Sequence, residues 1–244
     1  MSLRFHEISE ADHRILNPIT ETELMLLGEI CQLGAGSRHL DLASGKGEML
    51  CQWSRQWGSG GVGVDISKVF LAAARARAAE FGLEAKVRFD EGDAGHYQGD
   101  GEHFDLVSCI GATWIGGGLT GTLGLMKPFL KPGGLMLVGE PFWSATPPEK
   151  AYESSGIGRD ATLVGTLDRV ESCGMGLVEM VLANPNTWDR YVAAQWLTVD
   201  NWLRANPTDP EADALRGWIT RSRRNYLEYE RPGLGWGVFV LRVT

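Results

Sequence analysis

The sequence predicts a doubly wound α/β fold, with seven strands in a mostly parallel sheet, an antiparallel last strand and a small helical cap. Two observations carry this prediction. Short apolar runs of strand length alternate along the chain with segments of helical pattern, which is typical of a parallel sheet covered on both faces. Small or acidic residues follow four of these runs, at the edge where such sheets bind ligands.

Local signals support each element in turn. Thr20 and Glu23 form a capping box, so we expect a helix that ends near Gly34. Further helices are expected through Trp57, from Ser67 to Phe81, and near 162–172. The expected strands are residues 38–42, 62–65, 86–89, 104–110, 135–139, 177–182 and 236–241.

A long segment separates the last two expected strands. A direct connection would need only a few residues, whereas 184–234 carries two helical patterns split by the proline-containing stretch 206–210. We therefore expect 184–234 to be an inserted helical cap. Together with an N-terminal cap at about 1–20, it would sit on a single domain that spans 1–244.

The composition excludes several classes of function. With 244 residues, 43% of them hydrophobic, the chain can bury one large core. A formal net charge of −8 disfavours nucleic acid as a partner, and no stretch approaches ~20 apolar residues, so no membrane span is expected. The four cysteines are widely spaced and have no histidine nearby, which argues against a metal site and for a cytoplasmic location. The oligomeric state stays open.

The turn after the first strand is the main functional signal. Asp41 ends an apolar run, and the small residues Ala43, Gly45 and Gly47 follow at every second position before a helix that begins near Glu48. Residues with little side chain let the backbone approach a ligand closely, and the amides at the start of the helix point toward it. This pattern predicts a loop that binds a nucleoside-containing ligand.

Three later strand ends carry related signals. Asp65 ends the second strand, where its carboxylate can accept hydrogen bonds from two ribose hydroxyls. Asp93 and Ala94 come just past the third strand, and Gly111 follows the fourth. Because the carboxyl ends of parallel strands meet at one edge, we expect all of these residues to line one crevice.

Five motifs in this order resemble class I S-adenosylmethionine-dependent methyltransferases, over roughly 20–183 and 236–244. They are Asp41-x-Ala43-x-Gly45-x-Gly47, Val64-Asp65-Ile66-Ser67, Asp93-Ala94, Phe104-Asp105-Leu106-Val107 and Leu130-Lys131-Pro132-Gly133-Gly134. Three more segments, Ile8-Ser9-Glu10, His13-Arg14-Ile15-x-Asn17-Pro18 and Gly111-Ala112-Thr113-Trp114, resemble uncharacterised bacterial small-molecule methyltransferases. That group is similar to the ubiquinone/menaquinone and cyclopropane-synthase-like branches.

The resemblance implies a Rossmann-like fold with S-adenosyl-L-methionine as cofactor. Asp41 and Gly45 to Gly47 would surround its methionine moiety, and Asp65 would hold its ribose. Ile66 would pack on the adenine, and Asp93, with Ala94 beside it, would receive the adenine amino group. The family usually has glycine where this chain has Ala43, and alanine is compatible with that position if its φ is negative.

Candidate catalytic and substrate residues are fewer. Glu140 follows the fifth strand near Trp143, where burial among aromatic side chains would raise its pKa and suit it to act as a base. His13, before the first helix, is a second candidate base. A solvated strand end for Glu140 and a structural role for His13 are the alternatives. Trp114, Trp143 and Tyr191 are candidate substrate contacts, since aromatic side chains suit an apolar or cationic acceptor.

The function that the resemblance implies is methyl transfer to a small-molecule acceptor by direct in-line displacement. Such a reaction requires alignment and exclusion of water rather than a covalent enzyme intermediate. The alternatives are a nicotinamide-dependent oxidoreductase and a non-catalytic S-adenosylmethionine-binding module. The first would require Gly-x-Gly-x-x-Gly, but Leu50 stands three residues after Gly47.

Overall fold

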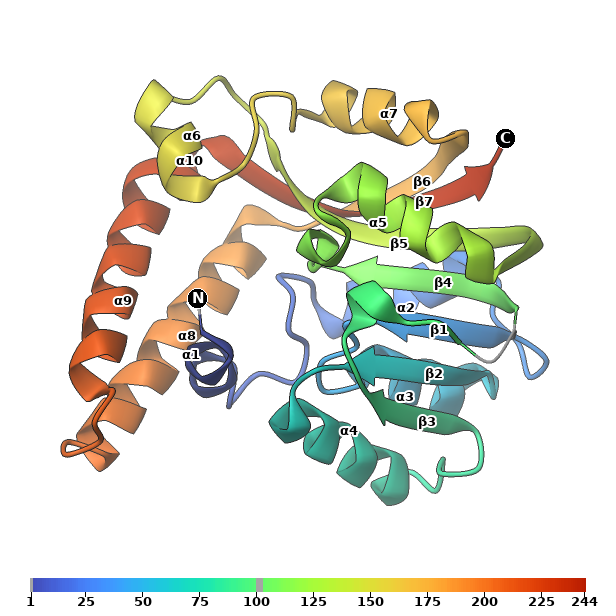
Figure 1. Ribbon diagram of the computed structural model, residues 1–244, viewed down its shortest axis with the longest axis horizontal. Coiled ribbons are helices and arrows are strands. Elements are labelled where there is room, and N and C mark those ends of the chain that lie inside the picture. The colour runs from blue at the N-terminus through green and yellow to red at the C-terminus, as the bar shows by residue number, and fades with distance from the viewer. Residues whose placement is uncertain (1, 100–102) are drawn as a thin grey trace.

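The structure, a computed structural model, describes residues 2–99 and 103–244 and is built on a seven-stranded sheet of order β3-β2-β1-β4-β5-β7-β6 (Figure 1). Its strands are β1 (Arg38–Leu42), β2 (Gly60–Asp65), β3 (Val87–Glu91), β4 (Phe104–Ile110), β5 (Leu130–Trp143), β6 (Met175–Leu182) and β7 (Leu234–Val243). Strands β1 to β5 pair in parallel, and β7 runs antiparallel to both of its neighbours, β5 and β6. The predicted fold is confirmed, including the antiparallel last strand.

The helices are α1 (Leu3–Ser9), α2 (Glu21–Ile30), α3 (Glu48–Trp57), α4 (Lys68–Glu80), α5 (Leu119–Met126), α6 (Glu149–Ser155), α7 (Leu163–Ser172), α8 (Pro185–Ala205), α9 (Ala212–Asn225) and α10 (Arg231–Gly233). Helix α2 begins with the capping box: the Glu23 amide donates to Thr20 Oγ1 over 3.1 Å, and the Thr20 amide donates to the Glu23 carboxylate over 2.7 Å. Among the described residues, no helix combines the length and the apolar character needed to cross a bilayer.

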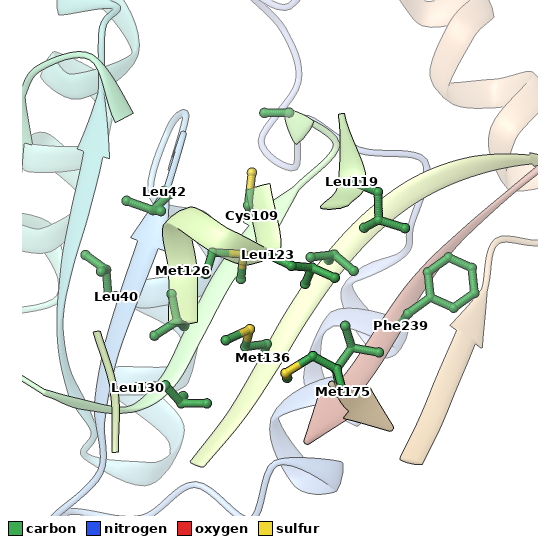
Figure 2. Close-up of a cluster of buried hydrophobic side chains, with 14 of the residues drawn as sticks. Leu40, Leu42, Cys109, Leu119, Leu123, Met126, Leu130, Met136, Met175 and Phe239 are labelled. Carbon is green, nitrogen blue, oxygen red and sulfur yellow. The ribbon is translucent and has the colours of Figure 1, made fainter. Parts of the chain in front are cut away.

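The sheet is covered on both faces because alternate side chains of each strand point to opposite sides. Met136 of β5 packs with residues of α5 and α7 on one face, whereas Leu137 packs with residues of α2 and α3 on the other. Figure 2 shows the first of these clusters, in which Leu123 and Met126 of α5 lie close to Met136. Each large side chain buried in this way contributes roughly 1.5–3 kcal/mol to folding, which fixes the strand ends around the site.

Helices α1, α8 and α9, called the cap below, pack together on the side of the sheet toward which β4 points (Figure 1). Ile8 of α1, Val199 of α8 and Leu215 of α9 share one apolar cluster, and Arg4 forms an ion pair with Asp209 over 2.6 Å. Helices α8 and α9 are the two helical patterns predicted in 184–234. Sequence reasoning missed α1, because a seven-residue helix is formed by packing rather than by its own propensity.

Candidate functional site

One cavity of about 890 Å³ lies between the carboxyl ends of the central strands and the cap. It brings together most of the residues selected from the sequence: Asp41, Ala43, Gly45, Asp65, Ile66, Asp93, Ala94, Gly111, Trp114 and Tyr191. Gly47, Glu140, His13 and Trp143 do not line it. Its position at the strand ends agrees with the expected crevice.

The loop between β1 and α3 contains three residues in the left-handed region, Ala43, Gly45 and Gly47, with φ values of 60°, 54° and 66°. A Cβ atom on Gly45 would lie 2.7 Å from Leu16 Cδ1, so any side chain there would displace the Leu16 side chain where the loop meets the N-terminal segment. The condition stated for alanine at position 43, a negative φ, is therefore not met. An alanine held in this region costs roughly 1 kcal/mol, which the surrounding packing offsets.

Gly47 shapes the loop rather than the cavity. It is the N-cap residue of α3, and a side chain there would collide with the ring of Phe89 and with Ala74. The expected cofactor contact of Gly47 is therefore corrected to a packing role. The missing side chain lets α3 lie close to α4 and β3.

Asp41 and Asp65 lie close to each other but differ in their partners. Asp41 accepts a hydrogen bond of 2.5 Å from the Ser108 hydroxyl, and burial raises its pKa to about 7. Asp65 accepts from the amides of Gly45 and Ser67, both over 2.8 Å. Asp65 thus ties the loop after β1 to the start of α4, and each of its oxygens keeps capacity for a further donor.

The end of the cavity near Asp93 is more open than the end near Asp41. Ile66 and Trp114 are 59% and 71% exposed, which leaves two apolar side chains at the cavity mouth without cover. The Asp93 carboxylate accepts from the His96 ring over 2.7 Å and from the Gly95 amide over 2.9 Å, and these bonds lower its pKa. This end therefore presents apolar surface beside a carboxylate acceptor.

Glu140 does not face the cavity, which corrects the sequence expectation. Its carboxylate is buried and accepts a short hydrogen bond from the hydroxyl of Thr113, the first residue of the short helix η2 (Thr113–Gly116). Burial raises the pKa of Glu140, as expected. Residues after β4 line the cavity where Glu140 does not. The raised pKa of Glu140 is therefore that of a buried carboxyl paired with Thr113, not that of a group facing the cavity.

Trp143 also lies elsewhere. Its indole nitrogen donates to the Gly158 carbonyl over 3.0 Å, and its ring meets Tyr152 edge to face at 5.2 Å. It belongs to an apolar cluster with α6 and the start of β7. Strand β5 extends to Trp143 itself, well beyond the expected 135–139, and this extension carries the side chain away from the cavity.

His13 and Tyr191 pack together at one wall of the cavity. Their rings are 4.9 Å apart, and only Tyr191 lines the cavity. The Tyr191 hydroxyl lies 2.6 Å from Glu10 Oε1 and 3.0 Å from the Leu16 carbonyl oxygen. His13 Nδ1 lies 3.0 Å from Glu10 Oε2. These contacts hold the N-terminal segment against α8.

Sequence reasoning missed how much of the wall the N-terminal segment supplies. Residues of α1 and the stretch from Arg14 to Ile19 line the cavity. The buried Lys46 ammonium, from the loop after β1, donates to the carbonyls of Glu10, Ala11 and His13, each over 2.7 Å. The sequence carries no local signal for this contact, called the Lys46 clamp below.

These residues suit an adenosyl amino acid. Carboxylates of Asp41, Asp65 and Asp93 are acceptors for ribose hydroxyls, an amino group and a cationic group. Ser44 lines the same wall, but its hydroxyl is buried beside Gly63 of β2 and does not face the cavity.

Comparison with known proteins supports this assignment. Residues 40–134 match the family model described as a methyltransferase domain. The chain is 44% identical over 242 residues to the uncharacterized protein YjhP of Escherichia coli (strain K12), covering 98% of this chain and 97% of that one. It is 30% identical over 143 residues, 56% of each chain, to the ubiquinone/menaquinone biosynthesis C-methyltransferase UbiE of Azotobacter vinelandii.

A solved structure extends the similarity to the whole fold. The S-adenosylmethionine-dependent methyltransferase of Geobacter sulfurreducens, crystallised with S-adenosyl-L-homocysteine, is 44% identical, with a TM-score of 0.93 over 100% of this chain and 99% of that one. The predicted family resemblance and the predicted cofactor are thereby confirmed. The chain belongs to the S-adenosylmethionine-dependent methyltransferases.

Proposed function

We propose that this protein transfers the methyl group of S-adenosylmethionine to a small-molecule acceptor by direct in-line displacement, acting as a single domain with its cap closed over the site. The observation that carries the proposal is the one cavity shared by the strand-end loops and the cap. Its volume of about 890 Å³ is of the size that holds a cofactor and a small second molecule.

The strand-end residues are proposed to hold the cofactor. The free acceptor capacity of Asp65 suits the ribose, and Asp41 with Gly45 suits the methionine end. Ile66 suits the adenine, whose flat ring would cover its exposed apolar surface, and Asp93 suits the adenine amino group. Trp114, a substrate candidate from the sequence, lies at the same mouth of the cavity and is reassigned in this proposal to the adenine. Ala94 and Gly111 complete this wall with small residues that allow close approach. The bound cofactor supplies an electrophilic methyl group.

The acceptor is proposed to lie against the opposite wall, which is largely apolar. Ile19, Leu24, Met49, Trp188 and Trp236 line it. Such a wall orients an acceptor by burial and keeps water from the reacting atoms. An acceptor with an apolar or aromatic body fits it best, and the partial relative UbiE, by its name, methylates carbon.

No base is assigned from the two sequence candidates. Glu140 is paired with Thr113, and His13 lies behind Tyr191, so neither side chain reaches the cavity. We therefore propose that the acceptor atom is nucleophilic without help from either residue. The work of the protein is then alignment and exclusion of water.

The test is a transfer assay with isotope-labelled S-adenosylmethionine and a fractionated small-molecule extract, read by mass spectrometry. The proposal expects labelled small molecules of largely apolar character. Label found in protein or nucleic acid, or no labelled product despite tight binding of S-adenosylhomocysteine, would contradict it. The variants Glu140→Gln and His13→Gln should retain turnover if neither residue is the base.

A further inference from the structure

A chain of three buried polar side chains leads from the core to the cavity. His39 and Asp41 lie two residues apart on β1, so both point to the same face of the sheet. Ser108 is the partner of Asp41 on the neighbouring β4. His39 Nε2 lies 2.6 Å from Ser108 Oγ, which lies 2.5 Å from Asp41 Oδ1. Asp41 alone of the three lines the cavity.

The single hydroxyl proton of Ser108 sets the direction of this chain. Because Ser108 donates that proton to Asp41, it must accept a hydrogen bond from His39, so Nε2 of His39 carries a proton. The other ring nitrogen, Nδ1, is buried without a hydrogen-bond partner in the described part of the chain. A proton there would create a buried, unpaired charge, and burial lowers the pKa of His39 to about 3. His39 is therefore a neutral imidazole that donates from Nε2 while Asp41 is ionised.

The imidazole is also fixed in place. Its ring stacks on Trp53 with centroids 5.3 Å apart and planes inclined by 28°, and the Trp53 indole nitrogen donates to the Leu24 carbonyl over 2.9 Å. His39 and Ser108 are almost completely buried, at 1% and 0% exposure. Neither side chain can reach a ligand, so any influence on the site passes through Asp41.

We propose that His39 and Ser108 are positioning residues for cofactor binding, which orient the Asp41 carboxylate through one directed chain of hydrogen bonds and favour its ionised form. This inference rests on the proposed contact between Asp41 and the methionine end of the cofactor. A hydroxyl that donates to a carboxylate favours the ionised form over the protonated one, and it leaves the second carboxylate oxygen for the ligand.

The other charged groups around the site do not replace this chain. Asp65, at the end of β2, raises the pKa of Asp41, and the Cys109 thiol of β4 is uncharged because burial raises its pKa. Among the cationic side chains that line the cavity, Lys46 is engaged with three carbonyls and Arg14 with Glu21 and Glu48. Within residues 2–99 and 103–244, the Ser108 bond is the interaction that lowers the pKa of Asp41.

The ionisation of Asp41 should make ligand affinity depend on pH. With a pKa of about 7, Asp41 is largely protonated below neutral pH and largely ionised above it. A ligand cation near Asp41 requires the ionised form, so affinity rises as pH increases and levels off above about pH 7. Below that pH, affinity falls by about tenfold per pH unit.

The experiment measures the affinity for S-adenosyl-L-homocysteine by calorimetry between about pH 5.5 and pH 8.5 in the whole protein and in Ser108→Ala. Removing the hydroxyl should move the midpoint of the profile upward by about one unit. Affinity at neutral pH then falls by about fivefold, and most of it returns at the alkaline end. His39→Phe, which keeps a ring against Trp53 but loses the donor, should shift the midpoint in the same direction by less.

Two controls make the result decisive. Ser54 of α3 has a buried hydroxyl without a partner among the described residues, so Ser54→Ala removes a similar group and should leave the profile unchanged. Asp41→Asn should abolish the pH step even if Ser108→Ala does not fold. Equal loss of affinity at every pH in Ser108→Ala, an unshifted profile, or a pH step that survives in Asp41→Asn would overturn the inference. No binding to the unaltered protein at any pH would instead overturn the proposed function.

Discussion

The two walls of the cavity are held in different ways. One wall, called the strand-end wall below, is formed by residues at the carboxyl ends of β1 to β4. There, polar side chains bond to the backbone of neighbouring loops, as Asp65 does to Gly45 and Ser67. The other wall, called the cap wall below, is formed by α1, the N-terminal segment and α8. There, side chains join segments far apart in sequence, as Tyr191 and Gln195 of α8 do with Glu10. The cofactor side is thus built into the sheet, whereas the cap side depends on the docking of α1 and α8. The cap reaches the proposed acceptor through Trp188 of α8, while Leu24, Met49 and Trp236 come from α2, α3 and β7.

Lys46 connects the two walls. It belongs to the cofactor loop, yet its ammonium holds three carbonyls of the N-terminal segment. Burial lowers its pKa, but the three acceptors compensate for the lost hydration. The loop after β1 and the N-terminal segment that covers it should therefore become mobile together.

The largest effect is expected in the core of the cap. Leu215 is fully buried between α1, α8 and α9, so Leu215→Ala leaves a cavity and should lower the free energy of unfolding by about 2–5 kcal/mol. Denaturant unfolding measures this loss. The matched control is Leu227→Ala, at a position 57% exposed, which should change stability by no more than about 0.5 kcal/mol. Similar losses in both variants would show that the cap is not held by this cluster.

The second effect concerns the link between the walls. Lys46→Met keeps most of the apolar part of the side chain but removes the donor to three carbonyls, so the free energy of unfolding should fall by about 1.5–3 kcal/mol. Limited proteolysis should then cut the segment before Thr20 faster. Lys68→Met, at a largely exposed lysine with a 3.4 Å contact to Glu91, is the control and should do neither. Unchanged protease resistance in Lys46→Met would contradict the clamp.

The third effect tests the strand-end wall. Asp65→Ala removes a proposed ribose acceptor, and its affinity for S-adenosylhomocysteine should fall by about 1–3 kcal/mol. Calorimetry on folded protein measures this loss. Asp90→Ala, on β3 and paired with Arg88 at the surface, serves as the control and should bind as the unaltered protein does. Full affinity in a folded Asp65→Ala variant would remove Asp65 from the cofactor site.

The smallest effect is a gain. Ala43 occupies the left-handed region at φ 60°, which glycine adopts without strain, so Ala43→Gly should stabilise the protein by roughly 0.5–1 kcal/mol. Thermal unfolding measures the change. Ala35→Gly changes an alanine whose φ is not positive, and it should give no gain. A loss of stability in Ala43→Gly would mean that the Ala43 methyl contributes more by packing than its backbone costs.

The strand-end wall could be predicted because its signals are local. A strand end, a turn of small residues and a following helix are contiguous in sequence, so Asp41, Gly45 and Asp65 could be placed at one edge from strand order alone. Glu140 and Trp143 were placed wrongly for the opposite reason. The end of β5 and the cover provided by Thr113 are set by pairing with β7 and by packing, which local patterns do not encode.

The sequence by itself determined the sheet and the strand-end loops that line the cavity, since hydrophobic periodicity and turn chemistry act over a few residues, and the resemblance of its motifs to a known family gave the class of ligand. Tertiary structure decided the rest. The wall made by the N-terminal segment, the Lys46 clamp and the His39–Ser108–Asp41 chain join residues that are 33 to 36, 67 and 69 positions apart. Such contacts form only when buried polar groups must find partners inside a particular packed fold, and no local pattern names those partners.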